Sequence, residues 1–174
     1  MNFYSRFKRF ESAHRANKAF PDHPERNLGS YTSYLSSDVA DGFLVDCPNA
    51  ASIVDVKGLL DGMCKAGFVK NRTLLARVNP SNEEFLAVAG IMFWTLEGTS
   101  VDDATMRLSE RYRADILKEL HVYYREELHI DNYAMRLGEL LTLVEIFEKS
   151  EKVNEFFELL RLLNVYSDDT FTYK

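Results

Sequence analysis

The chain has 174 residues and a formal net charge of −6, and 46% of its residues are hydrophobic. These numbers suit one globular domain with a sizeable core. The acidic balance, with lysine and arginine dispersed among the acids, argues against direct DNA contact by this chain. No apolar run approaches the roughly 18 residues of a membrane span, and the first twenty residues lack the apolar centre of a signal peptide, so we expect neither membrane contact nor secretion.

The first twenty residues predict a helix, because aromatic side chains recur in them at helical spacing: Phe3, Phe7 and Phe10. The helix should end before Phe20-Pro21, since a residue that precedes proline is pushed out of the helical region. Five basic residues against one acid in this stretch also fit a mitochondrial presequence. The aromatic spacing favours an ordinary core helix over that alternative.

Residues 28–35 combine tyrosine, threonine and leucine with glycine and serine, and they predict a short β-hairpin. Residues 53–63 predict a short amphipathic helix, and Phe68, Leu74 and Leu75 indicate another. No other stretch predicts a strand. The expected fold class is therefore all-α, a bundle of about six or seven helices with one small β-hairpin.

Ser81 followed three residues later by Glu84 is a capping box, and it predicts a helix that starts here. Residues 85–94 are apolar almost without interruption. A helix that is apolar on all sides should be buried on all sides, and Gly98 should end it.

Ser100 and Asp103 predict the start of the next helix, which should end near Leu128. Its expected apolar face consists of Val101, Ala104, Leu108, Tyr112, Ile116, Leu120 and Tyr123. Its opposite face should carry solvated ion pairs, Asp103 with Arg107 and Arg111 with Asp115.

Residues 131–164 form the longest span of helical apolar periodicity, with Asp131 as the expected N-cap. One stripe should face the core: Tyr133, Leu137, Leu140, Leu141, Val144 and Phe147. A second stripe lies on another side of the same helix: Met135, Leu143 and Ile146. The helix is therefore either central in the domain or half core and half partner interface, and a further apolar segment follows at 153–163.

Motifs that would carry chemistry are weak in this sequence. Glu11 with His14 and Glu126 with His129 have the Glu-x-x-His spacing of di-iron proteins, but chance and surface positions explain both pairs better. Cys47 and Cys64 lack metal or catalytic spacing. We therefore expect no enzyme, no metal and no cofactor.

Two L-x-x-L-L patterns, 137–141 and 159–163, have the spacing by which an amphipathic helix enters a hydrophobic groove. The same spacing is that of any core helix, and we favour the core interpretation for both.

Six segments, taken in chain order, carry a family resemblance: Asn2 to Ala13, Gly29 to Tyr31, Asp46 to Pro48, Glu84 to Trp94, Leu117 to Glu127 and Arg136 to Leu141. They resemble the second half of the central helix, the hairpin, the loop after it, and the eighth, ninth and tenth helices of the ligand-binding domain of nuclear hormone receptors. The similarity is greatest to the branch that is expanded in nematodes and related to the hepatocyte nuclear factor type.

The resemblance implies a layered helical bundle of the nuclear receptor ligand-binding type that acts in ligand-regulated transcription without catalysis. It implies a nuclear location, with the cytoplasm as the alternative. An apolar, lipid-like small molecule would occupy a cavity lined by residues of the central helix, the hairpin and the eleventh helix: Phe3, Phe7, Phe10, Tyr31, Leu75, Phe156 and Leu160.

The family dimerises largely through its tenth and eleventh helices, so the second stripe (Met135, Leu143 and Ile146) is expected to form a homodimer or a heterodimer with other nuclear receptors. A charge at Leu143 should then break the dimer. Nothing in the chain matches the family's first three helices, its activation helix or its two-zinc DNA-binding module. The expectation is thus a single, incomplete ligand-binding domain over residues 1–174, without a DNA-binding domain.

Two alternatives remain open. One is a non-receptor helical interaction protein, and the other is a receptor-derived inhibitor that dimerises with full-length relatives and blocks them. Coregulator binding, the ligand, the target genes and the dimer partner stay undetermined by the sequence.

Overall fold

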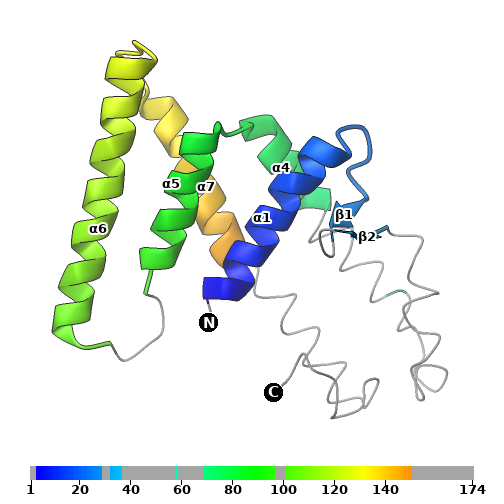
Figure 1. The fold of residues 1–174 in the computed structure, drawn as a ribbon, viewed down its shortest axis with the longest axis horizontal. Helices are drawn as coiled ribbons and strands as arrows, with labels where there is room; N and C mark the ends of the chain where they lie inside the picture. Colours follow the sequence, from blue (N-terminus) through cyan, green and yellow to red (C-terminus); the bar gives the residue numbers. More distant parts are fainter. Residues whose placement is uncertain (1–2, 29–31, 37–57, 59–68, 97–100, 150–174) are drawn as a thin grey trace. The chain divides into compact units, whose positions relative to one another are not determined.

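The structure of the protein is a computed structural model, which describes residues 3–28, 32–36, 58, 69–96 and 101–149 (Figure 1). The described elements are α1 (Phe3–Ala19), β1 (Asn27–Leu28), β2 (Tyr34–Leu35), α4 (Lys70–Val78), α5 (Asn82–Trp94), α6 (Asp103–Val122), the π-helical turn η4 (Tyr123–Glu127) and α7 (Ala134–Lys149). Helices with one pair of short strands confirm the all-α class and the small hairpin. None of the described helices combines the length and apolarity needed to cross a membrane.

The chain divides into two compact units. The first comprises Met1–Glu11 and Leu74–Glu148, and the second comprises Ser12–Thr73 and Lys149–Lys174. Helices α1 and α4 therefore contribute residues to both. Apart from residue 58, the second predicted helix (53–63) lies outside the described residues. So do Cys47, Cys64, Phe68, Gly98 and the apolar segment 153–163.

The core of the first unit forms where α1, α5 and α7 meet, and Figure 1 shows α5 lying next to α6 on its other side. The Phe10 ring of α1 stacks on Phe85 of α5, with ring centroids 4.7 Å apart, and meets Phe147 of α7 edge-on at 5.1 Å. Phe10, Val88 and Phe147 are fully buried. Removing a large apolar side chain from water contributes about 1.5–3 kcal/mol, so this contact is a main source of stability in the unit.

The start of α5 is the capping box that the sequence predicts. The Glu84 backbone amide donates to Ser81 Oγ at 3.2 Å, and the Ser81 backbone amide donates to Glu84 Oε2 at 2.8 Å. The preceding helix, α4, ends at Val78, and the next residue, Asn79, has a positive φ of 44°. Asparagine tolerates this left-handed conformation better than most residues do, so the chain can turn sharply into α5.

The expectation that α5 is buried on all sides is wrong. Leu86 is 68% exposed and Phe93 is 48% exposed, whereas Val88 and Met92 are buried. The helix is apolar all round, but in the described structure neighbouring elements leave part of its surface in solvent. The helix ends at Trp94, and Thr95 follows as its C-cap.

The apolar face predicted for α6 is also partly wrong. Leu120 is buried and Ile116 is partly buried, but Ala104, Leu108 and Tyr112 are exposed. Ser109 is buried instead. Its hydroxyl donates to the Trp94 carbonyl, and this hydrogen bond offsets the cost of removing the hydroxyl from water. The N-cap is Asp102, whose carboxylate accepts from the Ala104 and Thr105 amides at 2.9 Å.

Two further expectations for α6 are confirmed. The Arg111–Asp115 ion pair forms at 3.9 Å, and the helix and its η4 extension end at Leu128 as predicted. Asp131 does not cap α7. That helix begins at Ala134, where the Leu137 amide donates to the Tyr133 carbonyl at 2.9 Å, and Asp131 lies 3.9 Å from Arg125 instead.

Two glycines inside helices should respond differently to the same substitution by alanine. An added Cβ at Gly90 of α5 would lie 2.9 Å from Ile116 Cδ1, whereas at Gly138 of α7 it would meet nothing within 4 Å. Gly138→Ala should raise the free energy of unfolding by about 0.5–1 kcal/mol, because alanine is less flexible in the unfolded chain. Gly90→Ala should cancel that gain, since moving Ile116 off its rotamer costs about 1 kcal/mol. Urea unfolding followed by circular dichroism measures both, and equal gains would mean that the α5–α6 contact is loose.

The second unit contains a buried arginine at its centre. Arg72 of α4 is 1% exposed, and its guanidinium donates to the carbonyls of Ala16, Phe20, His23 and Arg26. Its Nε donates to Asn17 Oδ1 at 2.9 Å, and the Asn17 amide returns a bond to the Arg72 carbonyl at 3.1 Å. Burial lowers the pKa of Arg72, but the many acceptors keep the charge.

Arg72 thereby fixes the end of α1 and the turn that leads into the hairpin. Strands β1 and β2 pair antiparallel, with Asn27 opposite Leu35 and Leu28 opposite Tyr34. The Phe20 and Tyr34 rings lie 5.3 Å apart, and the Arg26 guanidinium lies over both.

Candidate functional site

The best-defined polar cluster in the first unit surrounds the buried carboxylate of Glu84. Arg136 of α7 donates to it twice, from Nε to Oε1 at 2.7 Å and from Nη2 to Oε2 at 2.5 Å. The Tyr124 hydroxyl donates to Oε1 at 2.6 Å. Burial by itself would raise the pKa of Glu84, but the hydrogen bonds from Arg136, Tyr124 and Ser81 outweigh it and hold the pKa below its ordinary value.

Arg136 joins three elements through this cluster. Besides Glu84 of α5, its guanidinium donates to the carbonyls of Val78 and Asn79 at the end of α4, at 2.6 and 3.2 Å. The hydrogen bond with Glu84 raises the pKa of Arg136, and burial next to Glu84 raises the pKa of Tyr124. Both side chains therefore keep their protons at neutral pH. The cluster of Glu84, Tyr124 and Arg136, which we call the tie, connects α7 to α5.

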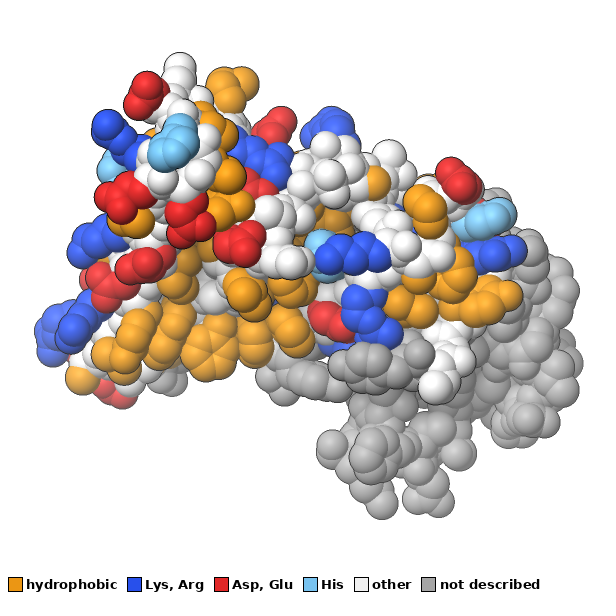
Figure 2. Space-filling view, turned by 45° about the horizontal axis from the view of Figure 1, so that its top comes forward, with side chains coloured by type: hydrophobic (Ala, Val, Ile, Leu, Met, Phe, Trp, Pro, Cys, Tyr) orange, Lys and Arg blue, Asp and Glu red, His pale blue; other side chains and the backbone are white. Residues whose placement is uncertain are grey.

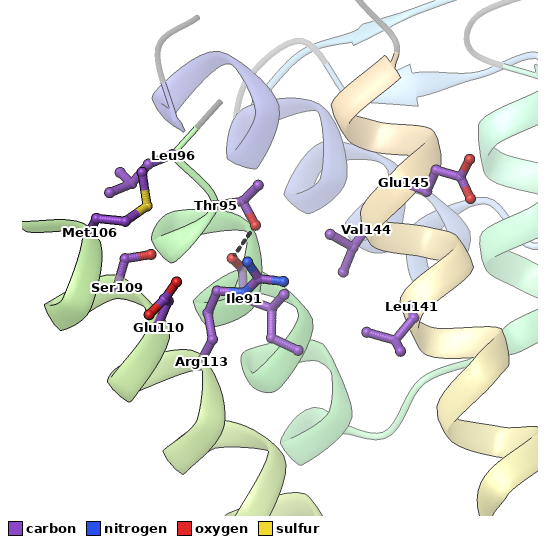
Figure 3. A pocket seen from close by; sticks show the side chains of 10 residues that line it. All are labelled: Ile91, Thr95, Leu96, Met106, Ser109, Glu110, Arg113, Leu141, Val144 and Glu145. Atoms are coloured by element: carbon purple, nitrogen blue, oxygen red, sulfur yellow. Dashed lines mark hydrogen bonds between the residues drawn. The ribbon is translucent and has the colours of Figure 1, made fainter. Parts of the chain in front are cut away.

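A hollow of about 390 Å³, which we call the three-helix hollow, lies between residues of α5, α6 and α7. It is lined by Ile91, Thr95 and Leu96 from α5 and the residues after it, by Met106, Ser109, Glu110 and Arg113 from α6, and by Leu141, Val144 and Glu145 from α7. Figure 3 shows the Arg113 side chain reaching toward Ile91, with Leu141 and Val144 on the opposite wall, and the bond from the Thr95 hydroxyl to the Ile91 carbonyl. The hollow thus has apolar walls with one guanidinium and two carboxylates among its lining side chains.

The ligand-pocket residues predicted from the sequence lie elsewhere. Phe3 and Phe7 are partly buried in an aromatic row, in which the Phe3 ring stacks on Phe7 at 5.5 Å and meets Phe93 edge-on at 4.9 Å. Phe10 and Leu75 are fully enclosed by protein. Tyr31, Phe156 and Leu160 lie outside the described residues.

The dimer residues predicted from the sequence do not share one exposed face. Met135 is 83% exposed, Ile146 is partly buried and Leu143 is 0% exposed. The expectation for Leu143 is therefore wrong, because this side chain belongs to the core of the chain itself. A glutamate at Leu143 would unfold the protein and would not report on a dimer.

The other motifs take ordinary positions where the structure describes them. In the first L-x-x-L-L pattern Leu140 is buried and Leu141 is half exposed, which is typical of a core helix edge, and the second pattern lies outside the described residues. His129 is exposed with a positive φ of 53°. Within the described ranges, no three His, Cys, Asp or Glu side chains are placed to hold a metal ion.

Sequence reasoning missed the tie between Glu84, Tyr124 and Arg136. It identified Glu84 as the partner of Ser81 in the capping box and as the first residue of a segment of the family resemblance, without a contact to Tyr124 or Arg136. No local pattern connects residues that are 40 to 52 positions apart. Two signals were available in the sequence. Glu84 is an acid at the start of an apolar helix, and Arg136 is an arginine next to an apolar stripe. A charge that is buried at such a position needs a partner.

Comparison with known proteins gives the family. Residues 67–163 match the family model of the ligand-binding domain of nuclear hormone receptor, a range that contains α4, α5, α6 and α7. Nuclear hormone receptor family member nhr-28 of Caenorhabditis elegans is 34% identical over 101 residues, which cover 56% of this chain and 23% of that protein. The nhr-28 protein of Caenorhabditis briggsae is 32% identical over the same length, with the same shares.

The matched region thus spans about a quarter of the length of these relatives. The family model covers more than half of the chain, and the relatives come from nematodes, as the resemblance in the sequence indicates. The match favours the receptor family over an unrelated helical interaction protein. The chain belongs to the family of nuclear hormone receptor ligand-binding domains.

Proposed function

We propose that this chain acts in the nucleus as a ligand-binding domain in transcription regulation, that it binds an apolar small molecule and that it dimerises with itself or with another nuclear receptor. The observation that carries the proposal is the family match over residues 67–163, within which Arg136 joins α7 to α4 and α5. Residues 1–174 then belong to one ligand-binding domain. Its action depends on binding and requires no catalytic group.

For the ligand, the proposal retains Phe3 and Phe7 as contacts. These rings are partly exposed and already form an aromatic row with Phe93, and such surfaces favour apolar small molecules. Tyr31, Phe156 and Leu160 remain proposed contacts from the family resemblance. Phe10 and Leu75 act through packing, because protein atoms enclose them.

For the dimer, the proposal moves the contact to the exposed side of α7. Met135 is exposed there, with Leu141 half exposed and Leu128 and Ile130 exposed in the preceding turn. Gly138 lies between the first two and is also exposed. An apolar surface with a glycine allows two helices to approach closely and favours association through burial of area.

Native mass spectrometry of the purified 174-residue chain tests both parts of the proposal in one measurement. We expect a dimer that carries extra mass of a lipid-sized molecule. Met135→Glu should abolish the dimer, because charge repulsion and desolvation of two carboxylates oppose association, and it should leave the fold intact because Met135 is so exposed.

Leu108→Glu is the matched control, since Leu108 is an exposed leucine of α6, and it should leave the dimer unchanged. A monomeric wild-type chain, or a Met135→Glu chain that dimerises as well as wild type, would contradict the proposed interface. A folded chain without extra mass after gentle purification would contradict the binding of a resident apolar ligand.

A further inference from the structure

A second hollow, of about 440 Å³, lies between α5 and the continuous helix formed by α6 and η4. We call it the α5–α6 groove. Its floor is apolar and includes Leu86, Tyr112, Ile116 and Tyr123. Leu86 is 68% exposed and Tyr112 is 43% exposed. A floor with such large exposed apolar side chains favours a partner that covers it.

The rim of the groove is acidic. Four carboxylates line it, Glu83 from α5 and Asp115, Glu119 and Glu127 from α6 and η4, and none of its lining residues is basic. Asp115 is already paired with Arg111 at 3.9 Å and with Lys118 at 3.3 Å. Figure 2 shows red acidic side chains next to orange hydrophobic ones in the region of α6, at the left.

The other three acids differ in their contacts. The Tyr123 hydroxyl donates a long hydrogen bond of 3.4 Å to the Glu83 carboxylate. Its backbone amide and Ser81 lower the pKa of Glu83, so this group is ionised at neutral pH. Within the described part of the chain, no ion pair involves Glu119 or Glu127. Two carboxylates without an ion pair, Glu119 and Glu127, therefore lie at the rim of an apolar floor, together with the hydrogen-bonded Glu83 and the paired Asp115.

The length and spacing of the groove define its occupant. The lining residues of α6 and η4 recur every three or four positions from Tyr112 to Glu127, which is about 22 Å of helix at 1.5 Å per residue. That length accommodates about four turns of a second helix. Two copies of this groove would place acids against acids, which disfavours symmetric self-association through it.

We propose that the α5–α6 groove binds a positively charged amphipathic helix of a partner protein, about four turns long. Apolar residues at i, i+3 or i+4 and i+7 of that helix contact Leu86, Tyr112 and Ile116. Lysine or arginine residues that flank its apolar stripe reach Glu83, Glu119 and Glu127.

The test uses a synthetic labelled peptide of about sixteen residues, four turns long, with leucines on one face and lysines beside them. Fluorescence anisotropy measures its binding to the full 174-residue chain. We expect binding that weakens as salt is added. The double variant Glu119→Gln/Glu127→Gln should weaken it about tenfold, and so should Leu86→Ser, which removes the apolar contact.

A charge-matched variant and a charge-inverted peptide are the controls. Glu110→Gln/Glu126→Gln removes the same charge from α6 and η4 outside the groove, and it should change the affinity by less than about twofold. A peptide with glutamates in place of the lysines should not bind. Equal losses in the two double variants would mean unspecific attraction, and full affinity of Leu86→Ser would mean that the floor is not used. Either result overturns the proposal, as does a dimer that Leu86→Ser converts to monomer, because a second copy would then occupy the groove.

Discussion

Arg136→Met should lower the free energy of unfolding by about 3 kcal/mol or more, because it leaves the carboxylate of Glu84 buried without its cation. Glu84 is 3% exposed and depends on Arg136 for two of its hydrogen bonds. Urea unfolding followed by circular dichroism gives the change. Arg125→Met is the matched control: Arg125 lies 3.9 Å from Asp131 in an exposed pair, which contributes less than about 1 kcal/mol.

The pH dependence of stability separates the charge effect from lost packing. The pKa of Glu84 in the folded state lies below its ordinary value of 4.5, so its contribution is present above that value and is lost as the pH falls through the folded pKa. Wild type should therefore lose stability on acidification below about pH 4.5 more steeply than Glu84→Gln does. Similar slopes for the two proteins, or equal losses for Arg136→Met and Arg125→Met, would show that the tie contributes little.

Arg72→Met should destabilise the second unit by about 3 kcal/mol or more. The substitution removes the hydrogen bonds that the guanidinium donates to Asn17 Oδ1 and to the carbonyls of Ala16, Phe20, His23 and Arg26. The first three of these carbonyls keep a backbone donor, but a hydrogen bond from a charged group contributes about 1.5–3 kcal/mol. The turn that these carbonyls form should open. Limited proteolysis within residues 20–28 measures that opening, together with urea unfolding.

Two further variants make the Arg72 prediction specific. Arg77→Met changes an exposed arginine in the last turn of the same helix, and it should alter stability by less than about 0.5 kcal/mol. Arg72→Lys should not restore the wild-type midpoint, because a single ammonium group cannot reach acceptors that the planar guanidinium bridges. Full stability of Arg72→Lys would mean that charge alone, and not the fork of donors, holds the turn.

The two sites differ in how visible they are in the sequence. The Ser81–Glu84 capping box is correct to the residue, because cap geometry depends on a local spacing of three residues. The partners of Glu84 and Arg72 are not visible, because they lie 40 to 56 positions away in the chain. Burial of an acid or an arginine demands partners, but local sequence does not say which.

The same division holds for the helical faces. The six segments of the family resemblance were sufficient to indicate the family. The periodicity of the apolar residues also predicted that α5, α6 and α7 form. It did not determine which apolar stripe is covered, because a stripe is a property of one helix and burial is a property of its neighbours. Leu143 was assigned to an exposed face and is buried, whereas Leu86 was assigned to the core and is exposed. Only the packing of α1, α5, α6 and α7 decided this, since each helix buries the side that its neighbours can cover and leaves the rest in solvent.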